Sequence, residues 1–168
     1  MITAGIAFIY YWIMALYKLT QAPRWQYEAM EFYCSLPIQG PIRGVTTYAT
    51  MYERMVRIQQ QPPLYNWLMC LWLQAGEGEW WFRFSSVVFG FLAAVGLYFV
   101  IRKLCDRWMA AFCVVIYSSI YILMYYIKEA SEYALLVMLL FWLLYVWILL
   151  CERRTATRVV LFTVLCTL

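Results

Sequence analysis

The stretch Trp81–Ile101, WFRFSSVVFGFLAAVGLYFVI, decides the class of the fold. Its single charged residue is Arg83, and as a helix it is long enough to cross a hydrocarbon core of about 30 Å. Three further apolar runs of roughly 18 residues or more have the same character: Ile2–Leu19, Trp108–Ile127 and Tyr133–Cys151. The sequence therefore predicts an all-α fold, a polytopic transmembrane helix bundle.

The composition supports a membrane protein with a single transmembrane domain over residues 1–168. Hydrophobic residues make up 66% of the chain and charged residues only 13%, too few to cover the surface of a soluble domain. The expected parts are a first span at 1–19, a large external loop at 20–80, and spans at 81–103, 108–127 and 133–151. A further apolar run begins after 158 and still continues at 168, so we expect a truncated span and interpret the chain as the N-terminal portion of a longer protein.

Several kinds of chemistry do not fit the composition. The chain has no histidine, which removes His-based triads and the commonest zinc ligand, and its six cysteines form no CxxC pair. No metal site and no cofactor is identifiable. The net charge of +4 is modest and the basic residues cluster at the ends of apolar runs, which argues against a nucleic-acid partner. The first run lacks a small-residue cleavage site and is interpreted as a retained helix.

The distribution of Lys and Arg predicts the orientation. The short segments Arg102–Arg107 and Arg153–Arg158 are both basic, and the positive-inside rule places both in the cytoplasm. Two spans separate these segments, so the chain returns to the same side of the membrane, in agreement with the positive-inside rule. The N-terminus is then cytoplasmic and the link Lys128–Glu132 external. We expect a multi-pass protein, most simply in a bacterial inner membrane.

The loop 20–80 is expected to carry amphipathic helices that lie along the outer membrane surface. Leu64–Ala75 is apolar but too short to cross, and a crossing there would invert the charge rule. Apolar residues recur with helical spacing over Trp25–Leu36 and Tyr48–Val56, with Pro and Gly between them. Interfacial helices of this type rest in the headgroup region.

Four motifs follow one another in an order that resembles a known family. They are WQYEA at Trp25–Ala29, PPLY at Pro62–Tyr65, RFSSVVFG at Arg83–Gly90 and KEASEY at Lys128–Tyr133. They are similar to the W-x-D-E-A, H/K-P-P-L-Y, R-L-P-S-x-x-F-G and Q-E-A-R-x-Y motifs of GT-C class membrane glycosyltransferases that use lipid phosphates. The resemblance is to the branch with protein mannosyltransferases and aminoarabinose transferases, glycosyltransferase family 39, and covers nearly the whole chain.

The polar positions of these motifs agree with the family only in part. The residues that agree are Glu28, Arg83, Ser86, Glu129 and Tyr133. The residues that differ are Tyr27 for the usual aspartate, Gln61 for His or Lys, Ser85 for proline, Lys128 for Gln and Ser131 for Arg.

The resemblance implies transfer of a sugar from a polyprenyl-phosphate donor to an acceptor hydroxyl on the external side. Such a reaction needs a base and positive groups near the leaving phosphate. Glu28 is the candidate base and Glu31 the reserve. The candidate substrate-binding residues are Gln61, Arg83, Lys128, Glu129 and Tyr133. Both acids can instead be solvated residues of an interfacial helix, and Arg83 can instead extend to lipid headgroups.

Two function classes remain open, and so does the question of whether the chain is an enzyme. The first is a transferase that acts with membrane lipids and a lipid-linked sugar. The second is a non-catalytic membrane subunit or scaffold that keeps the fold and binds partner membrane subunits; Tyr27 at the aspartate position favours it. A transporter is the least favoured, because no apolar run contains an internal acid.

Overall fold

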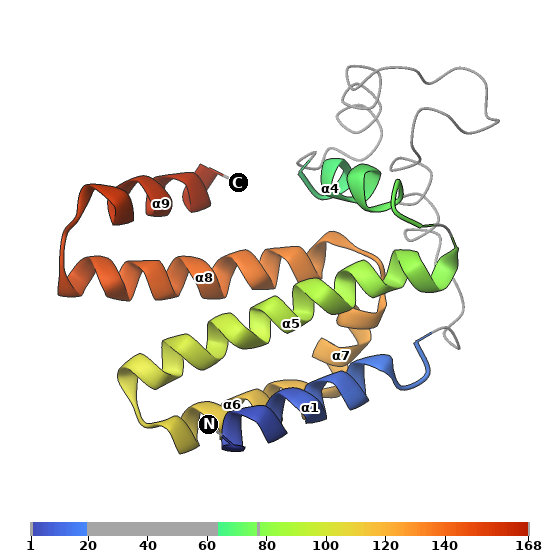
Figure 1. Cartoon of the computed structure of the whole chain (residues 1–168), viewed down its shortest axis with the longest axis horizontal. Coiled ribbons are helices and arrows are strands. Elements are labelled where there is room, and N and C mark those ends of the chain that lie inside the picture. Colours follow the sequence, from blue (N-terminus) through green and yellow to red (C-terminus); the bar gives the residue numbers. More distant parts are fainter. Residues whose placement is uncertain (1, 20–63, 77, 168) are drawn as a thin grey trace.

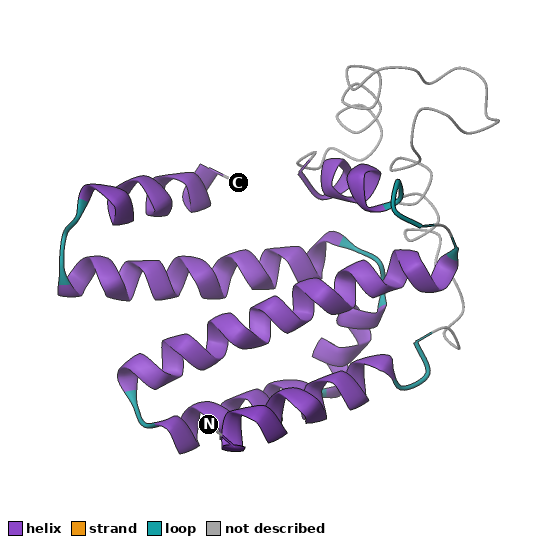
Figure 2. Cartoon of the chain, viewed as in Figure 1, coloured by secondary structure: helices purple, strands orange, loops and turns teal. Residues whose placement is uncertain are grey.

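The computed structural model describes residues 2–19, 64–76 and 78–167, and every regular element within them is an α-helix (Figures 1 and 2). The helices are α1 (Ile2–Leu16), α4 (Leu64–Trp72), α5 (Glu79–Leu104), α6 (Arg107–Ser119), α7 (Tyr121–Lys128), α8 (Glu132–Glu152) and α9 (Ala156–Thr167). The all-α fold class is therefore confirmed. The amphipathic patterns at 25–36 and 48–56 lie outside the described residues.

Among the described helices, α5 and α8 are long and apolar enough to cross a membrane. α8 has apolar side chains all around its axis, and residues such as Leu136, Leu140 and Leu144 are exposed on the outside of the bundle. A helix that is hydrophobic all around fits a lipid surrounding rather than water. α1 and α9 are shorter apolar helices.

The apolar run Trp108–Ile127 forms two helices rather than one. The axes of α6 and α7 are bent by 69° at Ile120. The two helices are long and apolar enough to cross a membrane only if they are taken together as one broken span. The hydroxyls of Ser118 and Ser119 donate to the carbonyls of Val114 and Val115, at 2.8 and 2.7 Å. Bonds of this kind compete with the helix's own hydrogen bonds and bend it. The two serines thus supply a cause for the break, which contains neither glycine nor proline.

α5 is the central helix of the described bundle. It packs along α8 on one side and against α1 and α6 on the other (Figure 1). Tyr11 of α1 donates its hydroxyl to the Val87 carbonyl at 2.7 Å, and Gly90 of α5 allows this close approach. A Cβ at Gly90 would lie 2.5 Å from the Tyr11 oxygen and 2.9 Å from Cγ2 of Ile127. The motif glycine therefore has a packing role.

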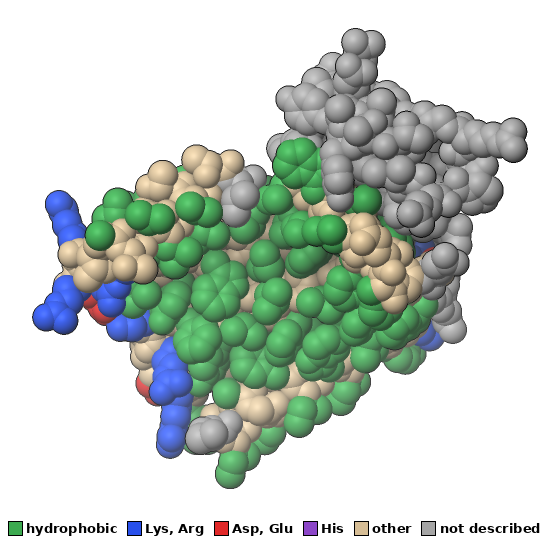
Figure 3. All heavy atoms as spheres, turned by 45° about the horizontal axis from the view of Figure 1, so that its top comes forward, with side chains coloured by type: hydrophobic (Ala, Val, Ile, Leu, Met, Phe, Trp, Pro, Cys, Tyr) green, Lys and Arg blue, Asp and Glu red, His purple; other side chains and the backbone are tan. Residues whose placement is uncertain are grey.

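The bundle has two chemically different ends. The α5–α6 and α8–α9 turns, which carry the basic segments, lie at one end, and α4 lies with the α7–α8 link at the other (Figure 1). In Figure 3 Lys and Arg side chains project at the first end of an otherwise mainly hydrophobic face. We call the second end the motif end, because Leu64 and Tyr65 of the PPLY motif and the segments Arg83–Gly90 and Lys128–Tyr133 begin or lie there.

Candidate functional site

The motif end has its own small hydrophobic cluster. Buried side chains from α4, from the first turn of α5 and from the link to α8 pack together; they are Tyr65, Met69, Leu73, Phe82, Ala130 and Leu135. Tyr65 closes the PPLY motif, Phe82 precedes the second-span motif and Ala130 lies in the KEASEY motif. Phe89 of the second-span motif packs against the same cluster. Three motif segments that are far apart in the sequence therefore meet at this cluster.

A reciprocal pair of tryptophans attaches α4 to α5. The indole N–H of Trp72 donates to the Trp81 carbonyl at 2.9 Å, and that of Trp81 donates to the Trp72 carbonyl at 3.1 Å. The two rings stack with centroids 4.7 Å apart. Gly76 in the connecting turn lies against the Trp81 ring, where a Cβ would come within 3.0 Å of it. Both indole donors are satisfied and the α4–α5 turn is fixed at two points.

Arg83 is buried, with 1% of its surface exposed. Its Nη1 donates to the carbonyl of Leu19 at 2.9 Å, just beyond α1, and its Nη2 lies 3.3 Å from Oε1 of Glu79 one turn earlier. The sequence left open whether this arginine extends to lipid headgroups, and the structure instead directs it inward to the end of α1. Its charge is placed where the carbonyl end of a helix carries partial negative charge.

Lys128, the last residue of α7, binds the same end of α1. Its Nζ donates to the Tyr17 carbonyl at 2.8 Å and lies 5.9 Å from the centre of the Tyr17 ring. Tyr17 and Leu19 are two residues apart, so their Cα atoms are at most about 7 Å from each other. The structure thus brings Arg83 and Lys128 together around the last residues of α1, and we call this arrangement the α1 anchor.

The rest of the KEASEY segment forms the turn between α7 and α8. The Glu129 N–H donates to the Tyr125 carbonyl, and the Ser131 N–H donates to the Glu129 carbonyl at 2.9 Å. Tyr133 is 48% exposed and its ring packs 5.1 Å from that of Tyr126. Glu129 and Tyr133 therefore lie at the motif end, next to Lys128.

Three candidate residues from the sequence, Glu28, Glu31 and Gln61, lie outside the described residues. The expected approach of Glu28 to Arg83 therefore stays a prediction. In the described part of the chain, no three His, Cys, Asp or Glu side chains are grouped so that they could hold a metal ion.

Sequence reasoning missed two buried hydroxyls at or near the motif end. Ser86 and Ser131 are 0% and 5% exposed, and neither hydroxyl has a hydrogen-bond partner among the residues that the structure describes. Both stand in the quoted motifs, one where the family has the same serine and one where it has arginine. In the sequence, only the motif match could have drawn attention to these two serines. A serine hydroxyl in an apolar run usually donates to a backbone carbonyl of its own helix, so an unpaired one is not expected. Cys70 on α4 is also buried, and burial raises the pKa of its thiol, so it acts as a small apolar group.

Comparison with known protein families agrees with this grouping of motifs. A model of the dolichyl-phosphate-mannose-protein mannosyltransferase family matches residues 60–168, more than half of the chain. The match contains all three motif segments that meet at the motif end. No curated protein and no solved structure matches the chain significantly. The family match and the helical membrane fold together show that this chain belongs to the dolichyl-phosphate-mannose-protein mannosyltransferase family.

Proposed function

We propose that this chain carries the donor end of a membrane glycosyltransferase that moves a sugar from a polyprenyl phosphate to an acceptor hydroxyl on the external side of the membrane. The observation that carries the proposal is the convergence of three motif segments at one end of the bundle. Two cations at that end, Arg83 and Lys128, are bonded to the last residues of α1, and they favour the negative charge of a departing lipid phosphate.

The two cations differ in what they can offer a phosphate. Arg83 is 1% exposed and already engaged with Leu19 and Glu79, so its contribution is the electric field at the motif end. Lys128 is less buried and uses one of its three N–H donors on the Tyr17 carbonyl. Its other donors suit direct contact with a phosphate oxygen. Glu129 and Tyr133 on the same link, and Gln61 just before α4, are assigned to sugar or acceptor hydroxyls.

We assign Glu28 as the base and Glu31 as its reserve. Tyr27 occupies the position where the family has aspartate, and a phenol with a pKa near 10 is a poor base at neutral pH. A carboxylate is fully ionised under the same conditions. Glu28 is the acid that remains inside the motif, so the acceptor's proton is assigned to it.

The test is transfer by the full-length protein, reconstituted with a panel of radiolabelled polyprenyl-phosphate sugars. We expect Glu28→Gln to abolish transfer and Tyr27→Phe to leave most of it. Glu31→Gln serves as the matched control on the neighbouring acid, and we expect a smaller loss there. Transfer that persists in Glu28→Gln would remove Glu28 as the base.

The second candidate is a non-catalytic subunit that keeps the family fold and assembles with partner membrane subunits. The replacement of the family aspartate by Tyr27 is the observation that favours it. If the intact protein transfers no sugar from any donor in the panel, while a Tyr27→Asp variant gains transfer, this second function replaces the first.

A further inference from the structure

The end of the bundle opposite the motif end holds the whole net charge of the chain. Six cations lie on the α5–α6 and α8–α9 turns and beside them; they are Arg102, Lys103, Arg107, Arg153, Arg154 and Arg158. Two acids accompany them, Asp106 and Glu152. The remainder of the chain has seven cations and seven acids, so it is formally neutral. We call these six cations the basic end (Figure 3).

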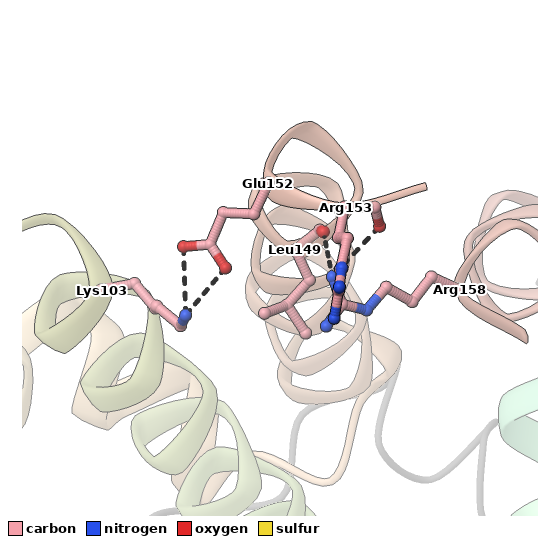
Figure 4. A network of polar contacts seen from close by, with 5 residues as sticks. All are labelled: Lys103, Leu149, Glu152, Arg153 and Arg158. Carbon is pink, nitrogen blue, oxygen red and sulfur yellow. Dashed lines mark hydrogen bonds and ion pairs between the residues drawn. The ribbon is translucent and has the colours of Figure 1, made fainter. Parts of the chain in front are cut away.

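Both acids of the basic end are already used within the protein. Glu152 pairs with Lys103 at 2.9 and 3.0 Å, which ties the end of α8 to the end of α5 (Figure 4). Asp106 caps α6 by accepting the Met109 N–H at 2.8 Å. The carboxylates therefore serve one lysine and one helix terminus, and the arginines of the two turns keep their charge uncompensated.

The six cations differ in how far their side chains are already engaged in hydrogen bonds and ion pairs. Arg158 donates to the carbonyls of Leu149 and Arg153 and caps the end of α8 (Figure 4). Arg153 and Arg154 are exposed, and within the described helices and turns their side chains form no hydrogen bond or ion pair. The Lys103–Glu152 pair keeps their turn next to Arg102, the neighbour of Lys103 on α5.

Apolar and aromatic surface begins directly beside these charges. Trp108 follows Arg107, is 59% exposed and lies under its guanidinium, with 5.9 Å between the Arg107 Cζ and the ring. Trp147 on α8 is 53% exposed. Tryptophan side chains of this kind are enriched at the boundary between headgroups and hydrocarbon. The basic end thus presents a row of cations at the edge of a lipid-facing apolar surface.

We propose that the basic end is a binding site for anionic glycerophospholipids, with Arg153 and Arg154 as its principal phosphate-binding residues and Arg102 and Arg107 beside them. Guanidinium groups bind phosphate oxygens through paired N–H donors, and the lipid's acyl chains match the apolar helices next to the charges. Basic groups between membrane helices attract anionic lipids in the same way. The site is separate from the motif end and does not depend on the proposed transferase activity.

The test measures binding of phosphatidylglycerol to the full-length protein in a zwitterionic detergent, by the shift in thermal unfolding midpoint and by retained lipid in native mass spectrometry. We expect phosphatidylglycerol, but not phosphatidylcholine, to raise the midpoint. The variant R153Q/R154Q should bind roughly 30-fold more weakly, because each cation near an anionic lipid surface contributes a factor of about five and the two factors multiply. R153K/R154K keeps both charges and should retain most of the binding.

The controls separate a lipid site from general attraction of anions. Lys18→Gln removes an exposed cation next to the α1 anchor and should leave the phosphatidylglycerol shift unchanged. Equal shifts with phosphatidylcholine, or an undiminished shift in R153Q/R154Q, would overturn the proposal. So would an inorganic phosphate titration that reproduces the full shift and displaces the lipid, because the site would then bind phosphate without the acyl chains.

Discussion

At Gly90, side chains of two neighbouring helices lie close to the backbone of α5. Its Cβ position lies 2.5 Å from the Tyr11 hydroxyl oxygen and 2.9 Å from Cγ2 of Ile127. We expect Gly90→Ala to lower the free energy of unfolding by about 1–3 kcal/mol, because a methyl group there forces α1 and α7 to shift. Thermal or denaturant unfolding in detergent measures the loss.

Gly5 provides the matched control for that substitution. It lies on α1, and a Cβ there would meet no atom within 4 Å. Gly5→Ala should therefore leave stability unchanged or raise it slightly through better helix propensity. An equal loss in both variants would show that the contact at Gly90 is not the cause.

Arg83 joins the end of α1 to the start of α5 through a charge that is removed from water. We expect Arg83→Gln to lower the free energy of unfolding by about 2–3 kcal/mol, because the Leu19 carbonyl loses a charged donor and Glu79 loses its partner. Glu79 keeps some contact with solvent, which limits the loss. Arg83→Lys should recover part of it.

The comparison for Arg83 is an exposed arginine on the same helix. Arg102 lies over the Tyr98 ring, with its Cζ 6.0 Å from the centre, and is exposed. Arg102→Gln, measured in zwitterionic detergent, should change stability by no more than about 0.5 kcal/mol. A similar effect of both substitutions would mean that the α1 anchor contributes nothing specific.

The α6–α7 break follows two neighbouring serines and contains no helix breaker. Replacing Ser118 and Ser119 together by alanine removes the bonds to the Val114 and Val115 carbonyls. We expect the 69° bend to open, since the helix can then continue through Ile120. Spin labels at the exposed positions Phe112 and Tyr126, in a cysteine-free background, should report a longer distance.

Threonine substitutions at both serine positions test the cause. Threonine keeps the hydroxyl and its bond to the carbonyl four residues earlier. The labelled double threonine variant should keep the distance of the parent protein. If the double alanine variant keeps it as well, the bend comes from packing against α5 and not from the serine hydroxyls.

Apolar length was the dependable signal for the helices. α5 and α8 follow the runs Trp81–Ile101 and Tyr133–Cys151 closely, because a long apolar helix satisfies its backbone internally wherever it lies. The α6–α7 break was not predictable by the same rule. Ser118 and Ser119 are compatible with a straight helix, and the break at Ile120 is seen only in the structure.

The sequence predicted which residues belong to the candidate site, but not how their side chains are arranged. The motif match singled out Arg83 and Lys128, yet nothing in the sequence indicated that both would bind the end of α1. Those contacts join residues 64 and 111 positions apart, and such pairs depend on how α1, α5 and α7 pack together. Local patterns carry no information on that packing.

The separation of the two ends of the bundle makes the orientation testable with native cysteines. Cys105 and Cys151 are exposed and lie in or next to the basic turns. If those turns face the cytoplasm, a membrane-impermeant maleimide should label either cysteine only in inside-out vesicles. Single-cysteine variants that retain one or the other keep the signal unambiguous.

Two outcomes would contradict this orientation. Labelling of Cys105 and Cys151 from opposite sides would mean that the two turns do not share a side. Labelling of both from the outside alone would invert the orientation and place the α1 anchor and α4 toward the cytoplasm.

The stacked indoles of Trp72 and Trp81 also give the protein an optical signature. Two indole chromophores 4.7 Å apart, with their planes 16° from one another, share their electronic excitation, and we expect a paired circular-dichroism band that isolated tryptophans lack. Among the described residues no other two indoles stack on each other. Within the described residues the band therefore reports on one contact, the packing of α4 on α5, although the chain contains nine tryptophans. Spectroscopy of unlabelled protein can follow that contact while lipid-linked sugars are added.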